Sequence, residues 1–261
     1  MSRRRVDTLL AERGLARSRT TAAESVRAGR VRIGRDGPIA LRPSQLVAED
    51  ADLTVAEPPR YVSRAGLKLE HALDALGIDV AGRECLDVGA STGGFTDCLL
   101  QRGAARVIAL DVGFGQLDWS LREDARVAVI ERLNARELEP AHLPFVPGFV
   151  TADVSFISLA KVLPAIARCL EPGSDVLALV KPQFELERGR VDKGGVVRSA
   201  ADRREALVRA AEAAEAAGLG FRAFASSGLP GPKGNQETFI HCVLGEAAAV
   251  DAETEARKVE P

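Results

Sequence analysis

Four charged residues, far apart in the sequence, could share one site of acid–base chemistry. Asp153 and Lys181 each end an apolar run that is typical of a buried strand, and Glu237 begins another. Lys68 lies in a segment with helical spacing of apolar residues. The chain has 29 Arg but only 6 Lys, and only Lys can be brought to lose its proton near neutral pH. Any one of these residues alone could be an ordinary surface charge, but four together would hold or move a proton.

The elements that must position these residues alternate between strand and helix. This alternation predicts an α/β fold with a doubly wound, mainly parallel, seven-stranded sheet of Rossmann-like type, which binds ligands at the carboxyl ends of its strands. A last strand that runs antiparallel would start at that edge, and a helix ahead of the first strand would run back toward it, so all four charged residues converge. We expect strands near 84–87, 106–111, 127–130, 148–153, 175–181, 221–225 and 237–244, and helices near 66–76, from 94, 158–170 and 202–217.

The turn after the first of these strands has the composition of a cofactor-binding loop. Small residues there let the backbone approach a ligand before a helix begins. Ser91 stands where the dinucleotide pattern G-x-G-x-x-G requires glycine, which leaves D-x-G-x-x-x-G. This pattern resembles the first motif of class I methyltransferases that bind S-adenosylmethionine; the alternative is any strand-loop-helix turn of an α/β protein. The predicted cofactor-binding residues of the loop are Asp87, Gly89, Ala90, Ser91, Gly93, Gly94 and Phe95.

Later strands add further cofactor-binding candidates. Asp111 closes its strand 22 residues after Gly89, the spacing at which a carboxylate can take both hydroxyls of a cofactor ribose. Asn134 or its neighbours would hold the adenine, although an Asn after a strand is also a common turn residue. Asp153 lies at the same edge and is included among the predicted cofactor contacts.

The first 60 residues differ from the rest in charge. They hold 12 Arg against 8 acidic residues, whereas residues 61–261 hold 23 Lys and Arg against 29 acidic residues. A basic segment on an acidic body indicates a nucleic-acid-binding module, with a solvated charge run as the alternative. The string RGLARSRTTAAESVRAGRVRI resembles the RNA-binding domain of the ribosomal-protein-S-four type, a small α+β domain of two short helices and a strand. The predicted RNA-binding residues are Arg3, Arg4, Arg5, Arg17, Arg19, Arg27, Arg30 and Arg32.

The break at Glu57-Pro58-Pro59 predicts the domain boundary. We expect an RNA-binding domain over 1–57, a linker over 58–63, a catalytic domain over 64–245 and a polar tail over 246–261, frayed helix or disordered. The four Cys are scattered, so we interpret them as buried apolar residues and predict no metal site or disulfide. The absence of a long apolar run predicts a cytoplasmic protein without membrane association, and no protein partner is implied.

Seven strings together resemble the TlyA family: YVSRAGLKL, LDVGASTGGFTDCLL, ALDVGFGQLDWSL, ERLNAR, TADVSFISL, LVKPQFE and GPKGNQETF. This family, sometimes labelled hemolysins, joins the RNA-binding module to a methyltransferase domain similar to FtsJ-type ribose 2′-O-methyltransferases. The resemblance implies S-adenosylmethionine as cofactor and a catalytic Lys-Asp-Lys-Glu tetrad at Lys68, Asp153, Lys181 and Glu237. Lys181 would assist a ribose 2′-hydroxyl, and Asp153 and Glu237 would orient the two lysines.

The same resemblance implies cytidine 2′-hydroxyls of ribosomal RNA as the target, in the large subunit and, for members with an extended N-terminus, the small subunit too. Arg3, Arg4 and Arg5 look like that extended form. Methyltransferases that act on amino groups typically carry an N-P-P-Y-like motif after the fourth strand, and this chain lacks it. Those that act on carbon 5 of pyrimidines need a Cys near the predicted rim, and this chain has none there. Nothing in the sequence resembles the acidic metal cluster of catechol-type enzymes. The alternatives are a membrane-active hemolysin and a non-catalytic RNA-binding protein.

Overall fold

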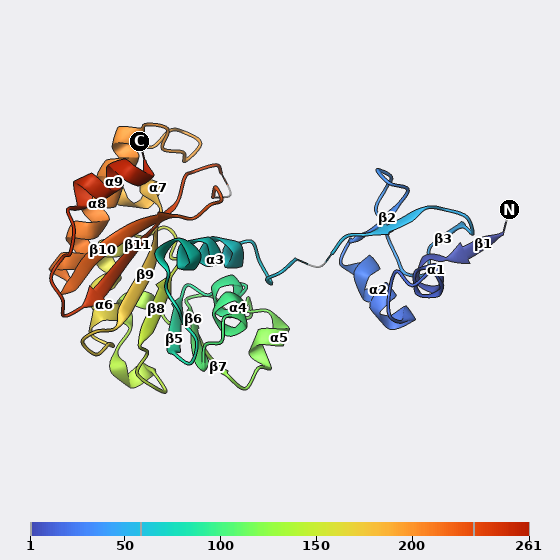
Figure 1. Ribbon diagram of the computed structural model, residues 1–261, viewed down its shortest axis with the longest axis horizontal. Helices are drawn as coiled ribbons and strands as arrows, with labels where there is room; N and C mark the ends of the chain where they lie inside the picture. The colour runs from blue at the N-terminus through green and yellow to red at the C-terminus, as the bar shows by residue number, and fades with distance from the viewer. Residues whose placement is uncertain (1, 58, 232, 261) are drawn as a thin grey trace. The chain divides into compact units, whose positions relative to one another are not determined.

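A computed structural model describes residues 2–57, 59–231 and 233–260. The chain divides into two compact units, Met1–Arg60 and Tyr61–Pro261, and each is described by itself (Figure 1). Pro58, which belongs to the predicted linker, lies outside the described residues. Tyr61 is 2% exposed and packs in the core of the second unit, so the end of the predicted linker is part of that unit.

The first unit holds two short helices and two small antiparallel sheets, as the expected α+β module requires. Helix α1 (Val6–Glu12) packs against α2 (Arg19–Arg27), which Ser18 caps by accepting a hydrogen bond from the backbone N–H of Thr21. Strand β1 (Arg3–Arg5) pairs with β3 (Leu46–Ala48), and β2 (Val31–Ile33) pairs with β4 (Leu53–Val55). A small apolar core that includes Val6, Leu9, Leu10 and Val26 holds these elements together.

The second unit is built on a seven-stranded sheet with strand order β10-β11-β9-β8-β5-β6-β7, which confirms the predicted fold class. The sheet is parallel except for β11, which runs antiparallel to both neighbours. The strands span β5 (Glu84–Val88), β6 (Arg106–Asp111), β7 (Val127–Glu131), β8 (Phe149–Ala152), β9 (Asp175–Val180), β10 (Leu219–Ser226) and β11 (Thr238–Leu244).

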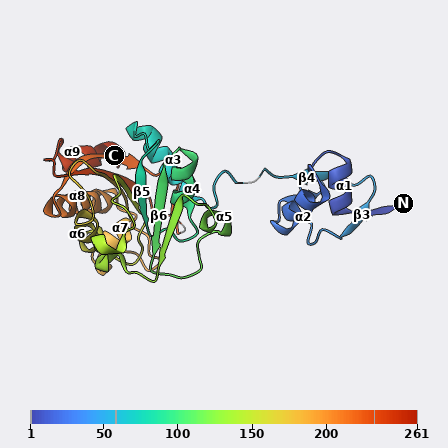
Figure 2. The same cartoon turned by 90° about the horizontal axis from the view of Figure 1, so that it is seen from below.

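Helices cover both faces of this sheet (Figures 1 and 2). One apolar core lies under α3 (Ala65–Leu76), α4 (Gly94–Gln101) and α5 (Trp119–Arg122). The other lies under α6 (Leu163–Ala167), α8 (Ala200–Ala216) and α9 (Ala252–Val259), while the short α7 (Pro182–Glu185) follows β9. The strands are rich in β-branched residues and leucine, and they contribute side chains to both cores. The sheet is therefore apolar on both faces, as a doubly wound sheet must be. Cys85, Cys98, Cys169 and Cys242 are all buried and free.

Two segments differ from their expected structure. The predicted helix over 158–170 is a 3₁₀ turn (Leu159–Lys161) followed by the short α6, because Pro164 lies at the start of α6 and cannot donate a hydrogen bond back into a longer helix. The predicted polar tail folds into α9, which packs against α8 and β10. Ala256 is fully buried and Glu260 is 4% exposed, so this segment belongs to the second unit.

Candidate active site

A cavity of about 640 Å³ opens at the carboxyl ends of β5, β6 and β8. Its volume lies within the range of small-molecule binding pockets, and its position is where doubly wound sheets bind ligands. Five of the residues predicted to bind a cofactor line it, namely Gly89, Ser91, Asp111, Asn134 and Asp153.

Gly89 allows the loop after β5 to lie directly against the segment after β8. Its φ is +85°, a left-handed conformation that glycine adopts without strain. A Cβ at this position would lie 2.4 Å from the carbonyl oxygen of Asp153, which is too close for any side chain. Only glycine therefore allows the two segments to touch at this point, and Gly89 itself lines the cavity.

Asp111 ties two cavity-lining loops together. Its Oδ2 accepts a hydrogen bond from the backbone N–H of Ser91 at 2.8 Å, and its Oδ1 accepts one from Gly113 at 2.6 Å. Each carboxylate oxygen has a second lone pair, so Asp111 can still accept hydrogen bonds from a ligand in the cavity. Asn134 caps a 3₁₀ turn (Ala135–Glu137) by accepting from the N–H of Arg136, and it lines the cavity as well.

The other loop residues predicted as cofactor contacts, Asp87, Ala90, Gly93, Gly94 and Phe95, do not line this cavity. Asp87 is fully buried, and its Oδ2 accepts hydrogen bonds from the backbone N–H and the hydroxyl of Thr96, so it fastens the start of α4 beneath the loop. Burial raises the pKa of the Asp87 carboxyl to about 7. Gly93 faces Leu117 and Leu121 so closely that a Cβ would collide with them. In the described structure these residues belong to the end of β5, the loop and the start of α4 but do not contribute to the lining of the cavity.

The structure joins the four predicted catalytic residues into two ion pairs. Lys181 Nζ lies 2.5 Å from Asp153 Oδ1, and Lys68 Nζ contacts Glu237 Oε2. Thr238 pairs with Val180 in the β9–β11 ladder, so Lys181 and Glu237 are the next residues of two adjacent strands. The Lys68 and Glu237 side chains are 10% and 2% exposed, whereas Asp153 lines the cavity. Residues from α3, β8, β9 and β11 thus meet at one edge of the sheet.

Two residues beside this arrangement were missed by the sequence reasoning. Lys181 Nζ donates a hydrogen bond to Ser155 Oγ at 2.8 Å, so Ser155 helps to fix the ammonium group. Phe156, 92% exposed with a φ of +64°, also lines the cavity. A large apolar side chain held outward by an unfavourable backbone conformation is typical of a binding site. Their signals in the sequence are their place directly after the strand that ends near Asp153 and their presence in the string TADVSFISL.

In the first unit several of the predicted RNA-binding arginines contact other residues of the unit. Arg4 makes ion pairs with Glu12 and Glu49, and Arg5 makes a two-pronged pair with Asp7, which holds the pKa of that carboxyl below its usual range. Arg30 is half-buried and donates to Ser25 Oγ. Arg19, which is exposed, lies 3.7 Å from Asp7 Oδ2, and exposed Arg32 donates to the carbonyl oxygen of Gly37. Arg3, Arg17 and Arg27 are exposed as well.

Comparison with known protein families gives two matches. Residues 61–243 match the FtsJ-like methyltransferase model, and residues 4–52 match the S4 domain model. A curated relative from Mycobacterium tuberculosis (strain H37Rv), named 16S/23S rRNA (cytidine-2′-O)-methyltransferase TlyA, is 51% identical over 243 residues, which cover 92% of this chain and 90% of the relative. The two matched regions correspond to the two compact units.

Solved structures agree with this result. A Streptococcus thermophilus protein described as a hemolysin is 38% identical and has a TM-score of 0.74, with 99% of this chain and 96% of that chain covered. Fibrillarin from Aeropyrum pernix, solved with bound S-adenosyl-L-methionine, covers 74% of this chain and 79% of its own at a TM-score of 0.50 and 19% identity, a likeness in fold alone. The chain belongs to the TlyA family, in which an S4 domain is joined to an FtsJ-like methyltransferase domain.

Proposed function

We propose that this protein transfers a methyl group from S-adenosylmethionine to the 2′-hydroxyl of cytidine in ribosomal RNA. The proposal is carried by one observation: the ion pairs Lys181–Asp153 and Lys68–Glu237 lie at one edge of the sheet of an FtsJ-like domain, and Asp153 also lines the cavity. The name of the Mycobacterium tuberculosis relative supports both the reaction and the substrate class. Its 16S/23S designation, with Arg3, Arg4 and Arg5 at the N-terminus, supports activity on both ribosomal subunits.

The residues that line the cavity fit the proposed cofactor. Gly89 and Ser91, which line the cavity, would lie against the methionine part, Asp111 would accept hydrogen bonds from the ribose hydroxyls, and Asn134 would contact the adenine. S-adenosylmethionine, when bound, supplies an electrophilic methyl group. Asp87, Gly93, Gly94 and Phe95 would support the loop rather than contact the cofactor.

Lys181 would act on the attacking hydroxyl of the RNA. A ribose hydroxyl is a poor nucleophile, so a group that takes its proton, or donates a hydrogen bond to the oxygen as charge develops, lowers the barrier. Asp153 and Ser155 hold the Lys181 ammonium group from two sides, and Glu237 holds Lys68. Alignment of the hydroxyl would supply much of the acceleration, and proton transfer about 10²–10⁴-fold.

The basic first unit would grip the RNA. Exposed Arg17, Arg19 and Arg27 can bind phosphates, and this unit contains no Phe, Tyr or Trp that could stack on an unpaired base. Recognition by this unit would therefore depend on the shape and backbone of folded RNA.

The test is to incubate the purified protein with tritiated S-adenosylmethionine and ribosomal subunits from cells that lack the relevant modification. Label in RNA, mapped to the ribose 2′-oxygen of cytidine, is the expected result. Label on a base, or none in RNA, would refute the proposal. Membrane lysis, which the hemolysin description of the Streptococcus thermophilus protein suggests, is tested in parallel by a liposome-leakage assay. We expect no leakage. None of the described helices has the length and hydropathy of a membrane-spanning segment.

A further inference from the structure

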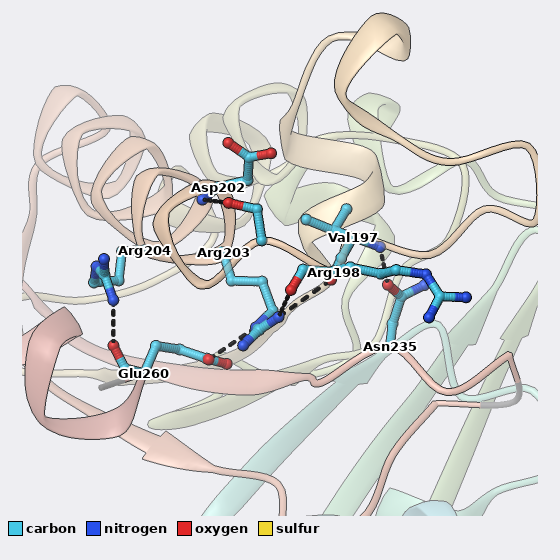
Figure 3. Close-up of polar contacts among 8 residues, drawn as sticks. Val197, Arg198, Asp202, Arg203, Arg204, Asn235 and Glu260 are labelled. Carbon is cyan, nitrogen blue, oxygen red and sulfur yellow. Dashed lines mark hydrogen bonds and ion pairs between the residues drawn. The ribbon is translucent and has the colours of Figure 1, made fainter.

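Asn235 is a buried polar residue outside the four-residue site, and it joins two loops. It is 2% exposed, although it lies in the long connection between β10 and β11. Its Oδ1 accepts a hydrogen bond from the backbone N–H of Val197 at 2.8 Å (Figure 3). Its Nδ2 donates one to the carbonyl oxygen of Gly195 at 2.7 Å. The Asn235 side chain thus makes two hydrogen bonds to the backbone of the 191–198 loop, and together they fix where the two loops meet.

Each of the two loops is close in the sequence to a proposed catalytic residue. The 191–198 loop is part of the connection that begins at Lys181, and Asn235 lies two residues before Glu237. Glu237 lies just beyond the last ladder pair, Thr238 with Val180, so the sheet alone does not fix its side chain. The conformation of the β10–β11 connection must therefore help to set the position of the Glu237 carboxylate.

The same connection folds closely over that carboxylate. The N–H of Gly231 donates to the carbonyl oxygen of Asn235 at 2.8 Å, and the N–H of Ser227 donates to that of Glu237 at 3.1 Å. A Cβ on Gly231 would lie 2.2 Å from Glu237 Oε1. A shift of the loop would therefore move the carboxylate, or open space for it to move, and change its contact with Lys68.

Arg203 supports the 191–198 loop from the opposite side (Figure 3). Its guanidinium donates to the carbonyl oxygens of Val197 and Arg198 at 3.3 and 2.8 Å, and its Nε lies 2.8 Å from Glu260 Oε2. Arg204 donates to the backbone carbonyl of Glu260 at 3.0 Å. The loop that Asn235 contacts is thereby fastened to α8 and to the end of α9, so it offers Asn235 a fixed partner.

We propose that Asn235 is a positioning residue for methyl transfer, which acts through Glu237 by tying the β10–β11 connection to the 191–198 loop. This inference rests on the proposed function. Asn235 itself does not touch the reacting atoms; it keeps Glu237 against Lys68 so that the site is assembled before RNA arrives. Because a small misplacement at a reacting centre reduces rates strongly, loss of the contact lowers turnover rather than cofactor affinity.

The test compares Asn235→Ala, which removes both hydrogen bonds, with Asn235→Asp, which keeps the acceptor for Val197 N–H but loses the donor to Gly195. We expect kcat to fall about 10- to 100-fold in Asn235→Ala and at least as much in Asn235→Asp, whose carboxylate oxygen would face the Gly195 carbonyl oxygen. The KM for RNA and the calorimetric affinity for S-adenosylhomocysteine should stay within about twofold. Asp192→Asn alters an exposed ion pair with Arg198 in the same loop and serves as the matched control with unchanged turnover.

A double-mutant cycle separates positioning from general destabilisation. If Asn235 acts through Glu237, Asn235→Ala should lower the residual rate of Glu237→Gln by less than about twofold, whereas a purely structural defect would reduce it by the same factor as in the wild type. Hydrogen exchange at the Val197 amide should become faster in Asn235→Ala, a readout that needs no activity. Wild-type turnover in Asn235→Ala, or full additivity in the cycle, would overturn the inference. A wild-type protein that transfers no methyl group to RNA would instead overturn the proposed function.

Discussion

Gly89 and Asp153 meet where the parallel strands β5 and β8 end, so closely that a Cβ on Gly89 would lie 2.4 Å from the Asp153 carbonyl oxygen. This contact joins the loop proposed to hold the cofactor to the segment that carries a proposed catalytic carboxylate. The proposed cofactor-binding loop and the proposed catalytic segment are therefore in direct contact, and a change in one should disturb the other.

Gly89→Ala tests this contact. Ala at a positive φ costs about 1–2 kcal/mol, and the collision with Asp153 adds to that, so the loop must shift. We expect a lower melting temperature and at least about tenfold weaker binding of S-adenosylhomocysteine by calorimetry. Gly148→Ala is the control, because a Cβ there would meet no atom within 4 Å. Wild-type affinity in Gly89→Ala would show that the loop does not contact the cofactor.

Lys181→Arg tests proton transfer. Arg keeps the positive charge opposite Asp153 but effectively cannot lose a proton, and its larger head does not fit the place of Nζ between Asp153 and Ser155. We expect methylation to fall by about 10²-fold or more while S-adenosylhomocysteine still binds. If Lys181→Arg methylates RNA at the wild-type rate, Lys181 is not the base.

Asp111→Ala tests the ribose contact. The substitution also removes the acceptor of two backbone N–H groups, Ser91 and Gly113, so the loop itself should loosen. We expect calorimetric affinity for S-adenosylhomocysteine to fall about 10- to 100-fold, as loss of hydrogen bonds to a charged group implies. Asp118→Ala removes a helix-capping carboxylate outside the cavity and should leave this affinity unchanged. Equal affinities in the two variants would remove Asp111 from the site.

The buried Asp87 predicts a pH dependence of stability. Its pKa is raised from 3.8 to about 7 by burial, so the folded protein favours the neutral carboxyl. The stabilising contribution is complete below pH 3.8 and is lost as the pH rises through about 7. Asp87→Asn keeps an acceptor for Thr96 and removes the ionisation, so between about pH 5 and pH 8 its melting temperature should fall less than that of the wild type. Thermal unfolding across a buffer series measures this, and parallel curves for the two proteins would contradict the assignment.

The contacts of the first unit predict which arginines control salt dependence. Exposed Arg17 and Arg27 should each contribute roughly one unit to the slope of log affinity against log salt. Arg5 is held by Asp7, so Arg5→Ala should change the slope less. Binding of ribosomal RNA is measured across a salt series for each variant. Removal of residues 1–55 should abolish methylation of subunits while cofactor binding persists, because Tyr61 and its core remain; full activity without them would contradict the targeting role.

Much of this architecture was predictable from the sequence because it depends on local patterns. Alternating apolar strands and helices predict the doubly wound sheet, and the carboxyl end of each strand follows from the point where its apolar run stops. Asp111, Asp153 and Lys181 each lie at such a point, so the pattern alone assigns them to the ligand-binding edge. The short basic module was equally readable, since its helices end at glycines and its charge differs from that of the rest of the chain.

Only the tertiary structure decided how these residues pair and which of them face the cavity. Lys68 and Glu237 are 169 positions apart, and their contact depends on the packing of α3 against β10, the strand next to β11. Asp87 looked like a cofactor ligand but turns beneath the loop toward Thr96, because neighbouring strand ends can point to either face. Asn235 stood in the string GPKGNQETF, but its contacts were not predictable, since a hydrogen bond between two irregular loops has no periodicity and forms only when distant segments fold together.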